Sequence, residues 1–390
     1  MPNRTPSEKG SKRLLFVVNV AWFFISHRLA LASAAKQRGW EVHVAAGGAT
    51  STEIELLERA GFHFHNLVLE RSSRNPLHNA ALVLRLIKLY RKVKPLLVHH
   101  VTIKPVMLGT LVARILRVPS VVNAVSGLGY SFTSNISRRR ALHAIVGLAY
   151  RVCLSHSNMT VIFQNPDDRA DFLKWTGIES LNSVLIAGSG VDVDAFHPTP
   201  EPETTIRVTL PARMLRDKGV VEFCKAIGDL KHQGILIEGI LAGGIDPENP
   251  ESLTTAELHQ LELRYGVRWI GHCKDVVSLF AQTHIVCLPS YREGLPKVLI
   301  EASAAGRAIV TTDVPGCRHV VEDTVTGILV PSGSVGALTD AIARLASSAD
   351  LRRRLGHAAR QRAEREFALN HVVSSTLLLY EKLGALIPDS

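Results

Sequence analysis

Short apolar runs alternate with longer amphipathic segments along the first half of the chain. The run RLLFVVNV at 13–20 predicts a buried strand, and the segment 23–40 has the apolar spacing of a helix that Gly39 ends. The same alternation continues to residue 165, which indicates a parallel sheet with helices on both faces. Further strands are expected at 41–48, 62–70, 96–101, 120–126 and 159–165, and further helices at 51–61, 75–95, from 105 onward and at 138–154.

A second series of the same kind follows the segment 188–205, GSGVDVDAFHPTPEPETT, which is rich in Gly, Pro and Thr and breaks the alternation. We therefore place the domain boundary there. The expected strands of the second series lie at 206–214, 235–244, 267–272, 284–290, 308–313 and 326–331, with helices from 218, near 254–264, before 284, after 295 and three at the carboxyl end.

The chain has 390 residues, a length that favours two domains over one. The pattern predicts an α/β fold of two Rossmann-like, doubly wound domains that face each other across a cleft. Ligands of such folds bind at the carboxyl ends of the strands. The expected parts are a flexible amino terminus at 1–11, a first domain at 12–190, a linker at 191–206, a second domain at 207–370, and a terminal helix at about 371–390 that joins the first domain.

Two glutamates stand eight residues apart in REGLPKVLIEASAAG, residues 292–306. Pro296 fits the first turn of a helix, and Glu301 then lies on an apolar helix face where an unpartnered carboxylate is costly. Either a cation of the fold or hydroxyl groups of a ligand must partner it. Glu293 lies in the loop before this helix, where amides near Gly294 and Leu295 suit an anion such as a diphosphate.

Two cations flank another expected junction between a strand and a helix. In RMLRDKG, residues 213–219, Arg213 and Lys218 lie on either side of the turn. Such a pair suits a diphosphate, and a solvated surface turn is the alternative.

Charge is unevenly distributed. Residues 1–190 contain 24 Lys and Arg against 10 Asp and Glu, and residues 71–166 contain no carboxylate. A one-sided basic half favours an anionic partner. The five cysteines are scattered without zinc spacing, which is typical of reduced thiols in a cytosolic protein. No secretory signal and no uncharged apolar stretch long enough to span a bilayer is visible.

Several motifs together are specific to one family. They are ARMLRDKG (212–219), LAGG (241–244), WIGHCKD (269–275), LPSYREGLPKVLIEASAAGRAIVTTDVPG (288–316) and GILVP (327–331). With them the chain resembles, over nearly its whole length, the retaining family-four glycosyltransferases of GT-B fold. Within that family it is similar to the members that act on lipid-linked sugars in bacterial polysaccharide or glycan synthesis.

The resemblance implies that the second domain binds a nucleotide-sugar, with UDP favoured by family frequency. Arg213 and Lys218 would bind the diphosphate, Glu293 would contact the donor sugar, and Glu301 would hold the ribose. Gly294, Leu295, Gly243 and Gly271 complete the implied donor side. The family requires no metal and no cofactor, so the DVD at 192–194 is interpreted as an interdomain turn.

On the acceptor side the chain departs from the family pattern. Many members carry a glycine pair after the first strand and a histidine in the catalytic site, where this chain has NVAWFFISHRLA and Ser126. The candidates here are His27, His100, Lys104 and Ser126; a packed core position is the alternative for the histidines. Retention by front-face attack, in which the leaving phosphate takes the acceptor's proton, needs no general base.

The expected activity is transfer of a hexosyl or N-acetylhexosaminyl group to a polyprenyl-diphosphate-linked or other lipid-linked glycan. The basic helices at 85–95 and 137–152 would bring the protein to the anionic inner face of the cell membrane from the cytoplasm. Nucleic acid is not an expected partner because no binding motif or stacking platform is present. The alternatives are a nucleotide-sugar epimerase of the same architecture and a non-catalytic nucleotide-sugar or membrane binding module.

Overall fold

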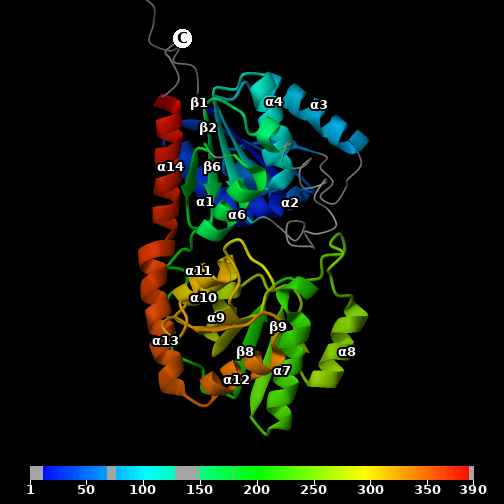
Figure 1. Cartoon of the computed structure of the whole chain (residues 1–390), viewed down its shortest axis with the longest axis vertical. Coiled ribbons are helices and arrows are strands. Elements are labelled where there is room, and N and C mark those ends of the chain that lie inside the picture. Colours follow the sequence, from blue (N-terminus) through cyan, green and yellow to red (C-terminus); the bar gives the residue numbers. More distant parts are fainter. Residues whose placement is uncertain (1–11, 68–75, 128–146, 148–149, 179, 386–390) are drawn as a thin grey trace, which may run out of the picture.

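The computed structural model describes residues 12–67, 76–127, 147, 150–178 and 180–385. Two α/β regions lie one above the other, each built around a parallel sheet (Figure 1). The two sheets confirm the predicted α/β class. The expectations for 1–11, 68–70, most of the helix at 138–154 and the last five residues lie outside the described residues.

The first sheet has the order β3-β2-β1-β4-β5-β6-β7, and all of its described strand pairs are parallel. Leu14 and Phe16 pack on one face, and Leu15 and Val17 on the other, so the central strand is buried on both sides. The strands are β1 (Lys12–Val20), β2 (Trp40–Gly47), β3 (His63–Asn66), β4 (Leu97–Val101), β5 (Ser120–Val125), β6 (Met159–Phe163) and β7 (Ser183–Leu185).

Some helix ends of this region lie at capping signals of the sequence. Thr50 caps α2 with a full capping box to Glu53, and Gly39 adopts φ 85° just after α1. The elements are α1 (Ala21–Gln37), α2 (Ser51–Arg59), α3 (Pro76–Val93), the π-helical turn η1 (Pro105–Gly109), α4 (Thr110–Ile115) and α6 (Pro166–Thr176).

The second sheet has the order β10-β9-β8-β11-β12-β13, again with parallel pairs in the described chain. Its core packs around β8, β9 and α7. The strands are β8 (Ile206–Pro211), β9 (Ile237–Ala242), β10 (Arg268–Trp269), β11 (Ile285–Leu288), β12 (Ala308–Thr312) and β13 (Ile328–Val330).

Helices cover both faces of the second sheet. They are the short turn η4 (Arg216–Lys218), α7 (Val220–His232), α8 (Thr255–Tyr265), α9 (Val276–Ala281), α10 (Lys297–Ala304), α11 (Cys317–Val320), α12 (Val335–Ala346) and α13 (Ala349–Arg362). The π-helical turn η5 (Ala363–Phe367) and the last helix, α14 (Leu369–Ala385), follow them.

Three elements, α6, β7 and α11, were not predicted, because each is short or lies beside a stronger apolar run. The strand expected at 62–70 is shorter than its pattern, with β3 ending at Asn66. Pro296 lies at the amino cap of α10, one position before the first turn in which it was expected.

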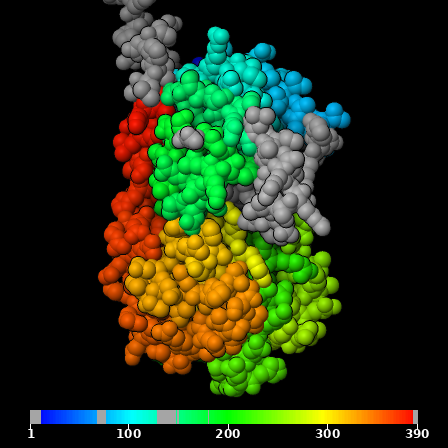
Figure 2. Space-filling model, viewed as in Figure 1, coloured from blue at the N-terminus to red at the C-terminus, as the bar shows by residue number. Residues whose placement is uncertain are grey.

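The last helix, α14, returns to the first sheet and packs on it (Figures 1 and 2). Tyr380 is fully buried against Trp40, and its hydroxyl lies 2.5 Å from Nδ1 of His99 on β4. The helices α13 and α14 thus run along one edge of both regions and connect them.

Side-chain contacts also connect the first region with the second. Arg292 lies 2.9 Å from the buried carboxylate of Asp168, and the side-chain amide of Asn165 donates to the carbonyl of Gly294. The ammonium of Lys297 donates to the carbonyl of Ser26 at 2.8 Å. In the part of the chain described, no helix combines the length and apolar character that a membrane span needs.

We expect Tyr380→Ala to destabilise the protein by about 3–5 kcal/mol, because it removes a buried aromatic ring and leaves a cavity. Leu378→Ala, on the same helix but 61% exposed, is the matched control and should cost less than about 0.5 kcal/mol. Urea denaturation followed by tryptophan fluorescence measures both; equal losses would contradict the packing of α14 on the first sheet.

Candidate functional site

A cavity of about 790 Å³ opens between the two regions, where the carboxyl ends of both sheets face each other. It lies where doubly wound folds bind ligands. Most of its wall comes from loops that follow strands. The first region contributes Asn19, Thr102 and Ser126, and the second contributes Ala212, Arg213 and Glu293.

A close ion pair lies on the wall of this cavity. The ammonium of Lys218, at the end of η4, is 2.6 Å from Oε1 of Glu293, and the hydroxyl of Ser290 donates to the same oxygen at 2.8 Å. Burial alone would lower the pKa of Lys218, but the carboxylates of Glu293 and Asp217 outweigh it and raise that pKa. Lys218 is therefore a firmly charged cation held by a carboxylate within the cavity.

Arg213 lies beside this pair, just after β8. Its guanidinium bonds the carboxylate of Asp246, and its side chain remains 39% exposed. Burial raises the pKa of Asp217, which also faces the cavity close to Lys218 and Arg213. The two cations expected from RMLRDKG are thus brought together at one strand end, with acidic groups around them.

Glu301 is buried on α10, with an exposure of 8%. Lys297, one helical turn earlier, is 3.3 Å from its Oε1. Burial raises the pKa of Glu301, and Lys297 opposes that rise. Of the two partners that the sequence left open, the structure supplies a cation of the fold. Lys297 itself lines the cavity, whereas Glu301 is not among the residues of its wall.

Gly294 and Leu295 form the contact between the loop before α10 and the first region. A Cβ on Gly294 would lie 2.3 Å from the carbonyl oxygen of Ser126, so only glycine permits this approach. Leu295 is buried and packs near Gly188. Both residues line the cavity as well.

Gly243 and Gly271 are not on the described wall of the cavity. Gly243 packs under the loop after β8, where a Cβ would meet the carbonyl oxygen of Ala212 at 1.7 Å, and its own carbonyl accepts the indole N–H of Trp269. Gly271 adopts φ 70° with no atoms near a would-be Cβ. The structure gives Gly243 a packing role that brings β8 and β9 together.

Two of the four acceptor-side candidates line the cavity. Ser126 follows β5, and His27 lies on α1, stacked on Phe23 with ring centroids 4.1 Å apart. Burial, together with the cations Lys297 and Arg28, lowers the pKa of His27 to about 3. His27 is therefore neutral at physiological pH and is a hydrogen-bonding and packing group there.

His100 is a core residue, and its placement on the acceptor side is wrong. It is fully buried, with Nε2 2.7 Å from the hydroxyl of Tyr90 and Nδ1 2.8 Å from Oδ1 of Asn123. It lies beneath α3 and α4, where it also contacts Thr110, and it is not on the wall of the cavity. Lys104 is half-buried before η1 and does not line the cavity.

Several polar residues of the wall were not predicted from the sequence, among them Asn19 and Thr102. Oδ1 of Asn19 and Oγ1 of Thr102 are buried without a hydrogen-bond partner among the described residues. Thr102 also adopts φ 75°, an uncommon conformation for a threonine. Buried unpaired groups and backbone strain are concentrated at ligand sites. The sequence indicates a role for Asn19 and Thr102 only through their position at the ends of β1 and β4.

Two family models match the chain. "Glycosyl transferase 4-like" matches residues 13–165, and "Glycosyl transferases group 1" matches residues 194–362. Together the matches cover most of both regions. Residues 166–193 lie between the two matches.

Curated relatives and solved structures agree with these matches. The capsular polysaccharide biosynthesis glycosyltransferase CapM of Staphylococcus aureus is 24% identical, over 78% of this chain and 79% of that protein. The N,N'-diacetylbacillosaminyl-diphospho-undecaprenol alpha-1,3-N-acetylgalactosaminyltransferase of Campylobacter jejuni is 26% identical, over 70% and 74%.

The fold is likewise that of a solved protein. The crystal structure of Anabaena HepE in complex with UDP-glucose superposes with a TM-score of 0.76 at 20% identity, over 96% of this chain and all of that one. The chain therefore belongs to the family-four glycosyltransferases of GT-B fold.

Proposed function

We propose that the protein is a retaining, metal-independent glycosyltransferase that moves a hexosyl or N-acetylhexosaminyl group from a UDP-sugar to a lipid-linked glycan. The observation that carries this proposal is the Lys218–Glu293 ion pair on the cavity wall, with Arg213 beside it. A diphosphate is the ligand that suits two cations at strand ends, and a carboxylate suits the hydroxyls of a sugar.

In the proposed reaction the acceptor hydroxyl oxygen attacks the anomeric carbon from the face that the diphosphate leaves. The bond between that carbon and the β-phosphate oxygen breaks, and the leaving phosphate takes the acceptor's proton. Lys218 and Arg213 stabilise the charge that develops on the diphosphate. Glu293 orients the sugar, and Glu301 accepts hydrogen bonds from the ribose.

The lipid-linked acceptor is supported by the name of the Campylobacter jejuni relative, which transfers its sugar to an undecaprenol diphosphate carrier. The cavity offers it the unpaired oxygens of Asn19 and Thr102 on the first-domain side, with Ser126 and His27 nearby. We place the protein at the inner face of the cell membrane, where such carriers present their glycans.

The surface of α3 supports a peripheral contact with that membrane. Leu77 and Leu84 are 76% and 67% exposed, and Lys88, Arg91 and Lys92 are exposed on the same helix. An anionic leaflet attracts such a helix by about 1 kcal/mol for each basic residue near its surface.

We expect Glu301→Gln to lower the affinity for the nucleotide without lowering the stability of the ligand-free protein. Because burial raises the pKa of Glu301, the folded state keeps this proton to higher pH than the unfolded state, and stability falls as pH rises through that interval. The ligand-free variant should therefore be at least as stable as wild type at pH 7. Its affinity for the nucleoside diphosphate should fall about tenfold or more, because the ribose loses a charged acceptor. Thermal unfolding with and without UDP, GDP and ADP measures both effects.

The companion variant Glu293→Gln should keep nucleotide affinity within about threefold and lose about 10²-fold or more in sugar transfer to a polyprenyl-diphosphate acceptor. Glu55→Gln, which breaks an ion pair with Arg59 on α2 outside the cavity, is the control and should retain both properties. Normal turnover in both Glu293→Gln and Glu301→Gln would refute the site.

For the membrane contact, we expect the double variant Lys88→Glu and Arg91→Glu to bind vesicles of anionic phospholipid at least tenfold more weakly than wild type. The reason is the loss and reversal of two charges on an exposed face. The control reverses two exposed lysines of α7, Lys225 and Lys231, and changes the net charge equally. Equal weakening in both would mean that net charge, and not α3, governs the binding.

A further inference from the structure

A cluster of histidine and glutamate side chains lies on the first sheet, away from the cavity. Glu41 and His43 come from β2, and His63 is the first residue of the edge strand β3. The strands are parallel, with His43 opposite His63 and Ala45 opposite His65. Since side chains alternate between faces with a period of two, Glu41, His43, His63 and His65 share one face of the sheet.

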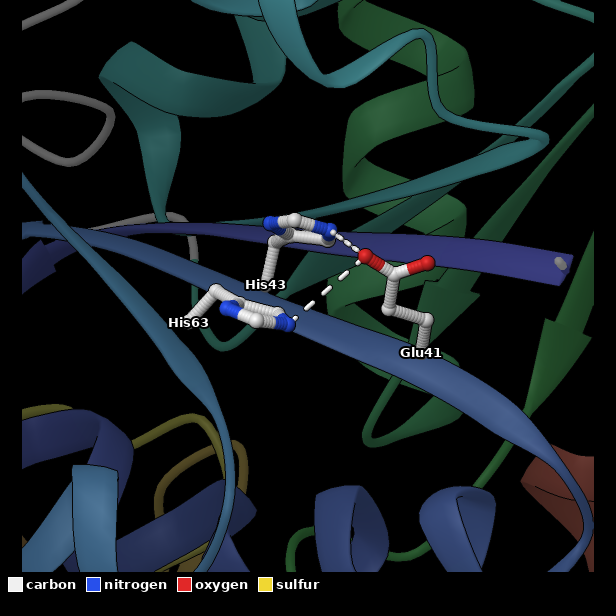
Figure 3. A group of neighbouring side chains, drawn as sticks. All are labelled: Glu41, His43 and His63. Carbon is white, nitrogen blue, oxygen red and sulfur yellow. Dashed lines mark hydrogen bonds and ion pairs between the residues drawn. The ribbon is translucent and has the colours of Figure 1, made fainter.

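The ligand atoms of three of these residues converge (Figure 3). Oε1 of Glu41 is 3.2 Å from Nε2 of His43 and 3.6 Å from Nε2 of His63, and one ligand atom from each residue lies within 4.8 Å of the others. Ligands 2.0–2.1 Å from a tetrahedral zinc ion lie about 3.3 Å from one another. We propose that Glu41, His43 and His63 form a binding site for one divalent transition-metal ion of the zinc type.

A neighbouring side chain orients the central ligand. Nδ1 of His43 is 3.0 Å from Nε2 of His65. When a metal takes Nε2 of His43, Nδ1 carries the proton and donates it to His65, which fixes the ring. Such a hydrogen bond from the second ring nitrogen is the usual support of a metal-bound histidine.

The donor atoms of the cluster indicate the kind of ion, and Glu41 supplies its carboxylate. Two imidazoles with a single carboxylate suit zinc, nickel or copper, whereas calcium and magnesium need several oxygen ligands. The three ligands leave the fourth tetrahedral position to water.

The site is distinct from the proposed reaction. The three ligands lie toward the amino ends of β2 and β3, whereas the cavity lies at the carboxyl ends of the strands, and none of the three is on its wall. A metal here would fasten the four-residue edge strand β3 to β2. Its effect is therefore on stability and on the protection of β3, and the transfer chemistry stays metal-independent.

The test uses the full chain without a histidine tag, freed of metal by chelation, at pH 7.5. Zinc chloride titrated by calorimetry should bind with one strong equivalent and raise the thermal midpoint. His63→Ala, a change at a side chain that is 60% exposed, and Glu41→Gln should each weaken this binding at least tenfold and abolish the zinc-induced rise. Cobalt(II) absorption in the visible range should report a four-coordinate site in wild type only.

The matched control is His259→Ala. His259 lies 2.8 Å from Glu262 on α8, a histidine–carboxylate pair without a second histidine ligand, so its loss should leave zinc binding unchanged. Two results would overturn the proposal: wild type that binds no zinc at micromolar concentration, or a strong equivalent that persists in His63→Ala, which would place the ion elsewhere, such as at Cys273.

Discussion

The ion pair between Lys218 and Glu293 is the interaction on which the cleft depends. A half-buried ammonium and a half-buried carboxylate are each costly alone, and at 2.6 Å each compensates the other while no ligand is bound. In the proposed function, a diphosphate that enters the cavity offers Lys218 a second anion and frees Glu293 to bind hydroxyl groups of the sugar. In this proposal the two residues bind each other in the absence of a ligand and bind the donor when it is present.

The geometry around this pair is set by close backbone contacts. Gly294 lies against the carbonyl of Ser126, and Gly243 lies under Ala212, so the loops at the ends of β5, β8, β9 and β11 meet with no room for a side chain. Two contacts beside the cavity connect the loop before α10 and the start of that helix to the first domain. They are the ion pair of Arg292 with Asp168 and the hydrogen bond from Lys297 to the carbonyl of Ser26. Preorganised charges in such a cleft act without reorganisation of solvent.

The sequence predicted what depends on local pattern. The alternation of strands and helices predicted two parallel sheets. The junctions at 213–219 and 290–296 indicated Arg213, Lys218 and Glu293 as candidates, and all three lie on the cavity wall. The partner of Glu301 was also visible in principle, since Lys297 stands four residues before it.

What the sequence did not predict depends on register and on contacts between distant segments. The burial of His100 depends on its contacts with Tyr90 of α3 and Thr110 of α4, which the sequence pattern does not specify. The convergence of Glu41, His43 and His63 depends on the pairing of β2 with β3. The unpaired oxygens of Asn19 and Thr102 become apparent only when the cavity between the domains is known.

The most direct test of the account is the binding of a nucleoside diphosphate to wild type and to Lys218→Gln. Calorimetry would use whichever of UDP, GDP and ADP wild type binds best, with Lys231→Gln on the surface of α7 as control. The account predicts that Lys218→Gln loses about tenfold or more in affinity and that the control loses none. Unchanged affinity in Lys218→Gln, or no binding of any of the three by wild type, would contradict it.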